Sequence, residues 1–567
     1  MTTPSPTGDT AAQRIARGYH STAATVLLGS VVIDGVVDPT ALVRIPLAMF
    51  NRHGLVAGAT GTGKTVTLQV IAEQLSAAGV PVLMPDVKGD LTGLLVPGQP
   101  GDKISSRAAE TGDEWAPEAF PVEFLSLAGQ GAAVPIRASI DSFGPILLSK
   151  VLDLNDTQES TLGLIFHWAD ARTLPLLDLK DLRAVIMHLT SDEGKEDLRE
   201  LGGVSKATAG VILRAVTNLD AQGGDQFFGE PELDVEDLLR VTQDGRGIIN
   251  LFAASGLQTN PVLFSTFLMW LLAELFEQLP EVGDIEKPKL VFLFDEAHLL
   301  FADASKAFLQ AVQQTVKLIR SKGVGVFFCT QLPTDVPSPV LSQLGARIQH
   351  ALRAFTPDDQ KALSSTVKTY PMTEDYQLAS ALTSLGTGEA IVTVLSEKGA
   401  PTPVAWTRIR PPHSQMAPAP TSEIAASIAS SPLMAKYGQA VDRNSAYEIL
   451  TARVAPNVPA GTAPVTLPTV PAGKTVPAGN GSQPPSGPPP PTLGPDGWPT
   501  LVPEPYNPYL DTPVAPPPQP APRGSAGSGG IGDLLNNPVV TSFMKSLGTS
   551  LGGALGRSVS GTRKRRR

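Results

Sequence analysis

The stretch "GATGTGKT", residues 58–65, decides the fold. It fits the pattern G-x-x-x-x-G-K-[ST] without deviation. The apolar run "HGLVAGA" that leads into it is typical of a buried strand, and "TVTLQVIAEQLSAAG", which follows, has the 3.6-residue apolar spacing of a helix. A glycine-rich turn between a strand and a helix is the context in which backbone N–H groups wrap around phosphates. The stretch therefore predicts an α/β domain with a mainly parallel sheet and a phosphate-binding loop.

Each residue type in this loop has a chemical reason to be there. The glycines let the backbone approach phosphates without side-chain clashes, and the amino end of the following helix adds its positive dipole. We expect Lys64 to reach the β- and γ-phosphates of ATP and the Thr65 hydroxyl to hold Mg²⁺. The expected nucleotide-contacting residues of the loop are Gly58, Ala59, Thr60, Gly61, Thr62, Gly63, Lys64, Thr65 and Val66.

A second stretch, "LVFLFDEAHLLF" at residues 290–301, supplies carboxylates. An apolar strand runs directly into Asp295 and Glu296. In that place Asp295 can hold the Mg²⁺ shell, and Glu296 can orient and polarise the attacking water. The alternative is that both carboxylates only cap the following helix. The phosphate loop upstream favours the catalytic interpretation.

The next apolar run, "GVGVFFCTQ" at 323–331, ends in Gln331. In a parallel sheet this places Gln331 at the carboxyl edge, where ligands collect. There it could couple the γ-phosphate to a nucleic-acid or subunit contact, or it could only cap a loop. We include it among the candidate catalytic residues, which from these motifs are Glu296, Lys64 and Gln331.

Composition changes along the chain indicate its organisation. We predict a flexible leader at 1–20, the first part of the α/β domain at 21–144, a helical insertion at 145–244, the second part of the domain at 245–410, carboxy-terminal helices at 411–453, a disordered Pro/Gly linker at 454–530, and a weakly amphipathic helix with a basic tail at 531–567. The linker follows from its proline and glycine content, because such a segment buries too little apolar surface to fold.

The 567 residues are enough for a large core, and the formal charge of −10 argues against a surface coated in basic patches. The single cysteine, Cys329, excludes an intrachain disulfide and fits a reducing compartment. The amino terminus has no secretory pattern. The apolar run at 262–276 is shorter than the roughly 20 residues of a membrane span, so we expect a buried core helix. These features predict a cytoplasmic protein that is not integral to a membrane.

The tetrapeptide DEAH at 295–298 suggests a DEAH-box helicase. That family also needs a serine-alanine-threonine motif and a second RecA-like domain with a glutamine-arginine-glycine-arginine motif. Neither motif is in the sequence, and the span after Gln331 is too short for a second complete domain before the linker. Only Asp295 and Glu296 of the tetrapeptide are expected to carry chemistry, and His298 is interpreted as a packing or helix-start residue.

Taken together, the motifs resemble the HerA–FtsK superfamily of ring-forming, RecA-like P-loop motor ATPases. The matching pieces are "NRHGLVAGATGTGKT", "DVKGDL", "LFDEAHLLF", "IRSKGVGVFFCTQLPTDVP" and "LGARIQHALRAFTPDDQKAL". Within that group the chain is similar to the bacterial HerA-like proteins related to YjgR. The resemblance covers roughly residues 20–453 and implies a RecA-like (ASCE) P-loop NTPase fold.

The resemblance also implies roles for single residues. Arg52 matches an arginine near the nucleotide, and Asp86 and Asp90 match acidic positions after the second strand. Arg320 matches the helix end from which the family supplies an arginine finger to the ATP of the neighbouring subunit. The alternative for Arg320 is a surface cation favoured by the helix dipole. The second choices for the finger are Arg347 and Arg353.

The same resemblance implies a homo-hexamer that hydrolyses ATP with Mg²⁺ and translocates DNA through its pore, with helicase-like activity. HerA proper has an amino-terminal barrel that docks a nuclease. Only about 30 residues precede Arg52 after the leader, so a nuclease partner is not expected. The first alternative is an ATPase that remodels or moves a protein partner, bound through the carboxy-terminal tail, as in related secretion ATPases. A nucleotide-dependent scaffold is the second, and the Asp295–Glu296 pair argues against it.

Overall fold

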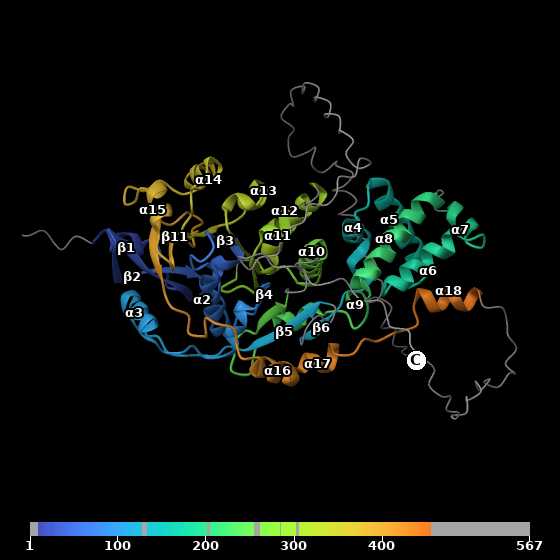
Figure 1. Cartoon of the computed structure of the whole chain (residues 1–567), viewed down its shortest axis with the longest axis horizontal. Coiled ribbons are helices and arrows are strands. Elements are labelled where there is room, and N and C mark those ends of the chain that lie inside the picture. Colours follow the sequence, from blue (N-terminus) through green and yellow to red (C-terminus); the bar gives the residue numbers. More distant parts are fainter. Residues whose placement is uncertain are drawn as a thin grey trace, which may run out of the picture. The chain divides into compact units, whose positions relative to one another are not determined.

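The computed structural model describes residues 10–127, 133–200, 205–253, 261–283, 285–301 and 306–454 (Figure 1). A single sheet orders its strands β2-β1-β12-β11-β10-β3-β9-β8-β4-β7-β5-β6. The strands are β1 (Thr25–Ile33), β2 (Val36–Pro46), β3 (Gly54–Ala57), β4 (Val82–Asp86), β5 (Val122–Leu127), β6 (Val134–Ile136), β7 (Ile249–Ala253), β8 (Leu290–Phe294), β9 (Val324–Thr330), β10 (Ala346–Gln349), β11 (Glu389–Thr393) and β12 (Ala405–Ile409). From β10 to β6 neighbouring strands are parallel, whereas β11, β12, β1 and β2 join antiparallel.

The longer helices connect these strands and cover the sheet. They are α1 (Ala11–Arg17), α2 (Lys64–Ala77), α3 (Asp102–Thr111), α4 (Ile140–Val151), α5 (Asp156–Ala171), α6 (Leu179–Thr190), α7 (Lys195–Glu200), α8 (Lys206–Leu219), α9 (Asp225–Phe227), α10 (Pro261–Gln278), α11 (His298–Phe301), α12 (Lys306–Ile319), α13 (Ser338–Leu341), α14 (Pro357–Val367), α15 (Leu378–Ser384), α16 (Thr421–Ser430), α17 (Pro432–Tyr437) and α18 (Ala446–Val454).

The central strands are apolar on both sides because each face of the sheet carries its own core. In β8, Phe292 and Phe294 belong to one hydrophobic cluster, and Val291 and Leu293 belong to the other. This alternation follows from the two-residue period of a strand. The helix α2 contributes to the second cluster, whereas α10 and α12 contribute to the first. A continuous apolar run is thus what a parallel strand buried on both faces requires.

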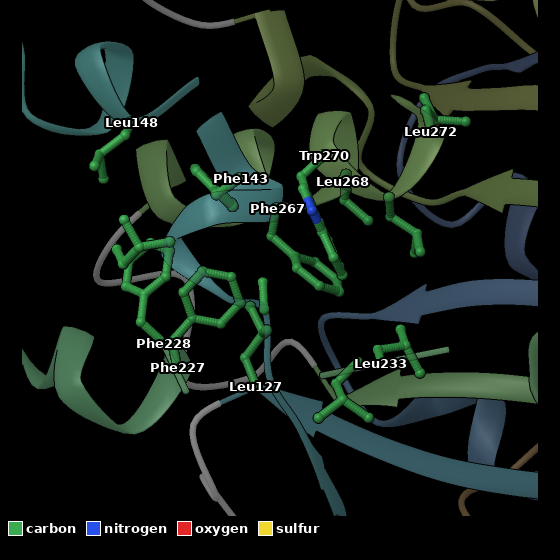
Figure 2. Packing of buried hydrophobic residues seen from close by; sticks show 14 of the residues in the cluster. Leu127, Phe143, Leu148, Phe227, Phe228, Leu233, Phe267, Leu268, Trp270 and Leu272 are labelled. Atoms are coloured by element: carbon green, nitrogen blue, oxygen red, sulfur yellow. The ribbon is translucent and has the colours of Figure 1, made fainter. Parts of the chain in front are cut away.

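Between β6 and β7 the described residues are helical, from α4 to α9. Aromatic rings connect this part of the chain to the sheet domain (Figure 2). Phe143 of α4 lies 5.8 Å from Phe227 between ring centroids, and Phe227 lies 5.7 Å from Phe267 of α10. Phe267 in turn stacks on Phe252 of β7 at 4.9 Å. The inserted helices therefore share one core with α10, which is the buried helix expected from the apolar run at 262–276.

The amino-terminal segment differs from its prediction. Residues 1–9 lie outside the described part, but residues 10–20 are not a flexible leader, because α1 occupies 11–17 and its Ile15 is buried. Tyr19 is also buried, and its hydroxyl donates to the carbonyl of Val392 at 2.8 Å. A polar sequence with a single apolar residue per turn concealed this docking helix.

The segment after β12 is fixed to the phosphate-loop helix α2. Glu73 of α2 is 3% exposed. Its carboxylate accepts hydrogen bonds from the backbone N–H of His413 at 2.9 Å and of Ser414 at 2.8 Å. Gln69, one turn earlier, donates to the Ser414 hydroxyl at 2.6 Å. We call residues 411–415 the strap. Burial raises the pKa of Glu73, and these bonds favour its ionised form.

Beyond the strap, α18 packs on α6 of the inserted helices. Asp181 of α6 is fully buried and accepts from the Ser445 hydroxyl at 2.6 Å and from the Tyr447 N–H at 2.8 Å. The predicted linker at 454–530 and the tail at 531–567 lie, apart from Val454, outside the described residues. Among the described helices, none combines the length and the apolarity needed to cross a bilayer.

Candidate nucleotide site

The phosphate loop joins β3 to α2 at the edge of the sheet where the parallel strands end, which we call the carboxyl edge. Gly63 caps α2 in the left-handed region with φ 111°. At Gly58, φ is 154° and an added Cβ would lie 2.5 Å from the Cβ of His350. Only glycine fits there, because a side chain would collide with the neighbouring strand. Lys64 turns back over the loop, and its Nζ donates to the carbonyls of Gly58 at 2.7 Å and Ala59 at 3.2 Å.

A second loop, residues 386–388 before β11, supports the phosphate loop. The N–H of Gly388 donates to the Thr62 carbonyl at 2.9 Å, and a Cβ on Gly63 would lie 3.2 Å from the Cα of Gly388. Arg107 of α3 holds this second loop, since its guanidinium donates to the carbonyls of Thr387 and Gly388 at 3.2 Å each. Sequence reasoning did not predict this support, because Arg107 and Gly388 are far apart in the chain.

His350, just after β10, underlies the loop from the side of the sheet. It is fully buried, and its Nε2 lies 2.9 Å from the Thr67 hydroxyl of α2. Burial, together with the nearby positive charge of Lys64, lowers the pKa of His350 to about 4. The ring is therefore neutral at pH 7 and acts as a hydrogen-bonding spacer between strand and helix.

The acidic pair follows β8 at the same edge. Burial raises the pKa of Asp295, whose carboxylate accepts from the backbone N–H of Glu296 at 2.9 Å. A buried carboxylate of this kind gains from a nearby cation, and a cation bound here would offset its desolvation. Glu296 has φ 50°, in the left-handed region that a non-glycine residue rarely adopts. Strained backbone of this kind clusters at functional sites.

Two cationic or potentially cationic side chains face the Glu296 carboxylate. The Nζ of Lys88, from the turn after β4, lies 2.5 Å from Oε1. The Nδ1 of His298 lies 3.3 Å from Oε2. Sequence reasoning interpreted His298 as a packing or helix-start residue, and His298 does begin α11. Lys88 was not singled out. The neighbouring positions of β4 and β8 in the sheet bring Lys88 and Glu296 together.

The acidic residues after β4 have separate environments. Asp86 accepts from the N–H of Gly89 at 2.7 Å and of Leu91 at 3.2 Å, so it closes the turn that carries Lys88. Burial raises the pKa of Asp86 to about 6. Asp90 is exposed at the start of a 3₁₀ turn, Asp90–Leu95. The geometry assigns Asp86 to shaping the turn.

Gln331 lies at the carboxyl end of β9 and is exposed, as its position in the sequence predicted. The residue before it, Thr330, is buried, and its hydroxyl donates to Asp335 at 2.6 Å. Asp335 also accepts from the N–H of Leu332 at 2.9 Å. Asp335 therefore caps this loop, and the Gln331 side chain is left on the surface at the edge where the phosphate loop lies.

The arginines named from the resemblance divide between the two edges of the sheet. Arg52 ends the 3₁₀ turn Leu47–Arg52 before β3, and Arg320 begins the turn Arg320–Lys322 before β9. Both lie where the parallel strands begin, which we call the amino edge. With a rise of about 3.3 Å per residue, the backbone of Arg52 is roughly 15–20 Å from the loop. β3 therefore separates Arg52 from the phosphate loop of its own chain, and a place for Arg52 near a nucleotide stays a prediction that needs the loop of a second copy.

The remaining two arginines differ from each other. Arg347 lies within β10, half-buried, and its guanidinium donates to the Leu341 carbonyl at 3.5 Å. Arg353 is exposed and follows the carboxyl end of β10. Of the four arginines, Arg353 is the one whose backbone shares an edge with Lys64. Arg320 cannot reach the loop of its own chain, but this position agrees with a role at the loop of a second copy.

The residues of the site fit a magnesium nucleotide. Thr65 at the start of α2 and Asp295 after β8 offer a hydroxyl and a carboxylate, the oxygen donors that Mg²⁺ takes alongside phosphates and water. Within the described ranges no group of three or more His, Cys, Asp and Glu side chains could hold a metal by itself. A metal here would depend on nucleotide phosphates to complete its ligands. Lys64 supplies the positive charge that those phosphates need.

Comparison with known proteins decides the family. A family model described as "Helicase HerA-like C-terminal" matches residues 34–472. The chain belongs to this family. The resemblance to HerA-like proteins and the RecA-like P-loop fold are thereby confirmed, and the protein is a P-loop ATPase. No curated protein matches the chain.

Solved structures similar to this HerA-like ATPase include two kinds of protein. The plasmid coupling protein TrwB in complex with ADP and Mg²⁺ is 16% identical with a TM-score of 0.44, over 70% of this chain and 91% of that chain. VirB4 of Thermoanaerobacter pseudethanolicus is 14% identical with a TM-score of 0.44, over 72% of this chain and 100% of that chain.

Proposed function

We propose that this HerA-like protein hydrolyses ATP with Mg²⁺ in a ring of identical subunits and uses the energy to translocate DNA. The observation that supports this most directly is the geometry of the carboxyl edge. Lys64 is folded over a complete phosphate loop, and Asp295 and Glu296 end a strand of the same sheet at the same edge. The conserved chemistry of such sites is phosphoryl transfer to water.

Each side chain has a defined task in hydrolysis. Mg²⁺, when bound, would neutralise phosphate charge. Thr65 and Asp295 are the residues that would hold it. Lys64 neutralises the β- and γ-phosphates, and Glu296 orients the attacking water and accepts its proton. Gln331, exposed at the end of β9, is placed to sense the γ-phosphate or a bound substrate.

The assembly is inferred from Arg320. Its position at the amino edge separates it from the loop of its own chain. A second subunit packed with its carboxyl edge against this amino edge would receive Arg320 next to its γ-phosphate. A closed ring of such head-to-tail contacts, which we propose is a hexamer, gives every site one arginine.

The alternative function is moving or remodelling a protein. The formal charge of −10 favours this alternative, because DNA binding depends on basic side chains that contact phosphates. The two functions differ in salt dependence. A DNA motor should lose DNA affinity steeply as the salt concentration rises, whereas an ATPase acting on a protein should show no salt-sensitive DNA binding.

The decisive experiment measures ATP hydrolysis without DNA, with single-stranded DNA and with double-stranded DNA. The full chain is compared with Lys64→Ala and with Arg320→Ala. We expect DNA to stimulate hydrolysis several-fold in the wild type and in neither variant. If DNA does not change the rate of hydrolysis at low salt, the proposed substrate becomes a protein. If the folded, assembled chain does not hydrolyse ATP, the proposed function is overturned.

A further inference from the structure

Lys88 makes a contact that the proposed chemistry does not use. It belongs to the turn after β4, and its Nζ lies 2.5 Å from Oε1 of Glu296, the residue expected to activate water. The Lys88 side chain is 49% exposed, whereas that of Glu296 is 13% exposed. Charge-assisted hydrogen bonds of this kind are the strong ones. A half-exposed ammonium group therefore occupies one oxygen of a largely buried carboxylate.

The other oxygen of Glu296 is also faced by a nitrogen. The Nδ1 of His298 lies 3.3 Å from Oε2. The backbone of Glu296 is in the left-handed region with φ 50°, a conformation that the surroundings must impose. Lys88 and His298 thus approach the carboxylate from two elements, the turn after β4 and the start of α11. Lys88 therefore holds Oε1, whereas Oε2 has the Nδ1 of His298 nearby but accepts no hydrogen bond from it.

The backbone that carries Lys88 is fixed, so its side chain is the part able to move. Asp86 accepts from the N–H groups of Gly89 and Leu91 and closes the turn on both sides of Lys88. Asp90, exposed two residues after Lys88, and Asp295 add negative charge near the ammonium group. A swing of the Lys88 side chain away from Glu296 therefore needs no rearrangement of the sheet.

A general base must accept a proton from water within hydrogen-bonding distance. A carboxylate oxygen that already accepts a short bond from an ammonium group is a poorer acceptor for water. We propose that Lys88 is a positioning residue that restrains Glu296, and that hydrolysis speeds up when the Lys88 side chain leaves the carboxylate. The inference rests on the proposed ATP hydrolysis. It adds an inhibitory contact, which we call the brake, between Lys88 in the turn after β4 and the carboxylate of Glu296.

The test compares Lys88→Met with the wild type in full-length protein without DNA. Since exposed ion pairs contribute little and each tenfold in rate corresponds to about 1.4 kcal/mol, removing the restraint should raise kcat about three- to fivefold. The KM for ATP should stay near the wild-type value, because Lys88 acts on the base. Lys88→Arg should bring the rate back toward the wild type. Lys361→Met removes an exposed lysine that is paired with Asp358 on α14, and serves as the matched control.

Glu296→Gln separates the two ideas. If the wild type hydrolyses ATP and Glu296→Gln does not, the proposed function stands, and the Lys88 variants then test the brake alone. The faster rate of Lys88→Met must vanish in the double variant Lys88→Met/Glu296→Gln. An unchanged or slower kcat in a folded Lys88→Met protein overturns the brake. Absent hydrolysis in the wild type overturns the proposed function instead.

Discussion

The two edges of the sheet carry different chemistry. The carboxyl edge has the phosphate loop with Lys64 and the carboxylates Asp295 and Glu296. The amino edge has Arg52 and Arg320, which precede β3 and β9. Parallel strands have their carboxyl ends at one edge of the sheet and their amino ends at the other. The sheet therefore separates the residues expected to bind phosphate and metal from these two arginines. The comparison teaches that the residues proposed to bind phosphate and metal meet within one chain, whereas the arginines of the amino edge would reach a phosphate loop only in the proposed assembly, at the loop of a second copy.

The largest effect on ATP hydrolysis is expected from a substitution at the carboxyl edge. Lys64→Ala removes the cation that lies over the loop, and we expect ATP hydrolysis to fall by about 100-fold or more, because electrostatic stabilisation of the transferring phosphate is lost. Phosphate release measures the effect. Lys361→Met, which removes an exposed lysine paired with Asp358 in α14, is the control for loss of a lysine. Wild-type hydrolysis by Lys64→Ala would show that the loop is not the catalytic site.

The next effect joins the two edges across subunits. Arg320→Ala should lower hydrolysis about 10- to 1,000-fold if Arg320 acts at the phosphates of a neighbouring subunit. Mixing inactive Lys64→Ala and Arg320→Ala proteins is the sharper measurement. Some interfaces in mixed rings pair an intact loop with an intact arginine, so part of the activity should return.

No recovery on mixing, in rings shown to exchange subunits, would contradict an action between subunits. Arg52→Ala provides the comparison on the same edge. Arg52 precedes β3 and its carbonyl accepts from the N–H of Gly345. If only Arg320→Ala is rescued, the finger is assigned to Arg320. If only Arg52→Ala is rescued, it moves to Arg52.

A smaller effect concerns the loop that supports the phosphate loop. Gly388→Ala places a Cβ on a backbone with φ 72°, and 2.5 Å from the Arg107 guanidinium. Left-handed backbone costs about 1–2 kcal/mol for a residue with a Cβ, so we expect a lower thermal midpoint and weaker ATP binding. Gly386→Ala is the matched control, because its Cβ would meet the carboxylate group of Glu389 at no less than 3.4 Å. Equal behaviour of the two variants would remove the special role of Gly388.

The smallest effect depends on pH. Burial and Lys64 lower the pKa of His350 from 6.5 to about 4. As the pH falls, His350 binds a proton in the unfolded chain before it does so in the folded chain. The free energy of unfolding therefore decreases as the pH falls from about 6.5 toward about 4. For one such group the loss between pH 7 and pH 5 is about 1–2 kcal/mol. Urea unfolding measures the free energy of unfolding of the wild type and of His350→Gln. The difference between the two should become smaller by about 1–2 kcal/mol from pH 7 to pH 5.

His53 titrates in the same window, since burial lowers its pKa to about 4 as well. Buried carboxyls act in the opposite direction, and burial raises the pKa of Glu274 to about 7. His53 and Glu274 are present in the wild type and in His350→Gln, so their contributions cancel in the difference between the two free energies of unfolding. A constant gap between the two proteins from pH 7 to pH 5 would contradict the assignment to His350.

Local patterns were sufficient for the centre of the fold and of the site. The phosphate loop, β8 with its acidic pair and β9 with Gln331 each follow from consecutive residues, because strand, turn and helix signals are local. The contact between Lys88 and Glu296 could not be predicted, since it depends on β4 and β8 being neighbours in the sheet. The separation of Arg52 from the loop of its own chain was not predicted either, because nearness in sequence to the loop hid the strand between them.

The strap fixes where the chain can be shortened. Glu73 lies almost fully buried on the phosphate-loop helix, with a carboxylate whose acceptors are filled by His413 and Ser414. A chain that ends at β12 would leave this carboxylate without its donors, on the helix that begins at the phosphate loop. Residues 411–415 must therefore be retained in any shortened form of the catalytic domain. A shortened protein intended for crystals or kinetics should be cut after α18.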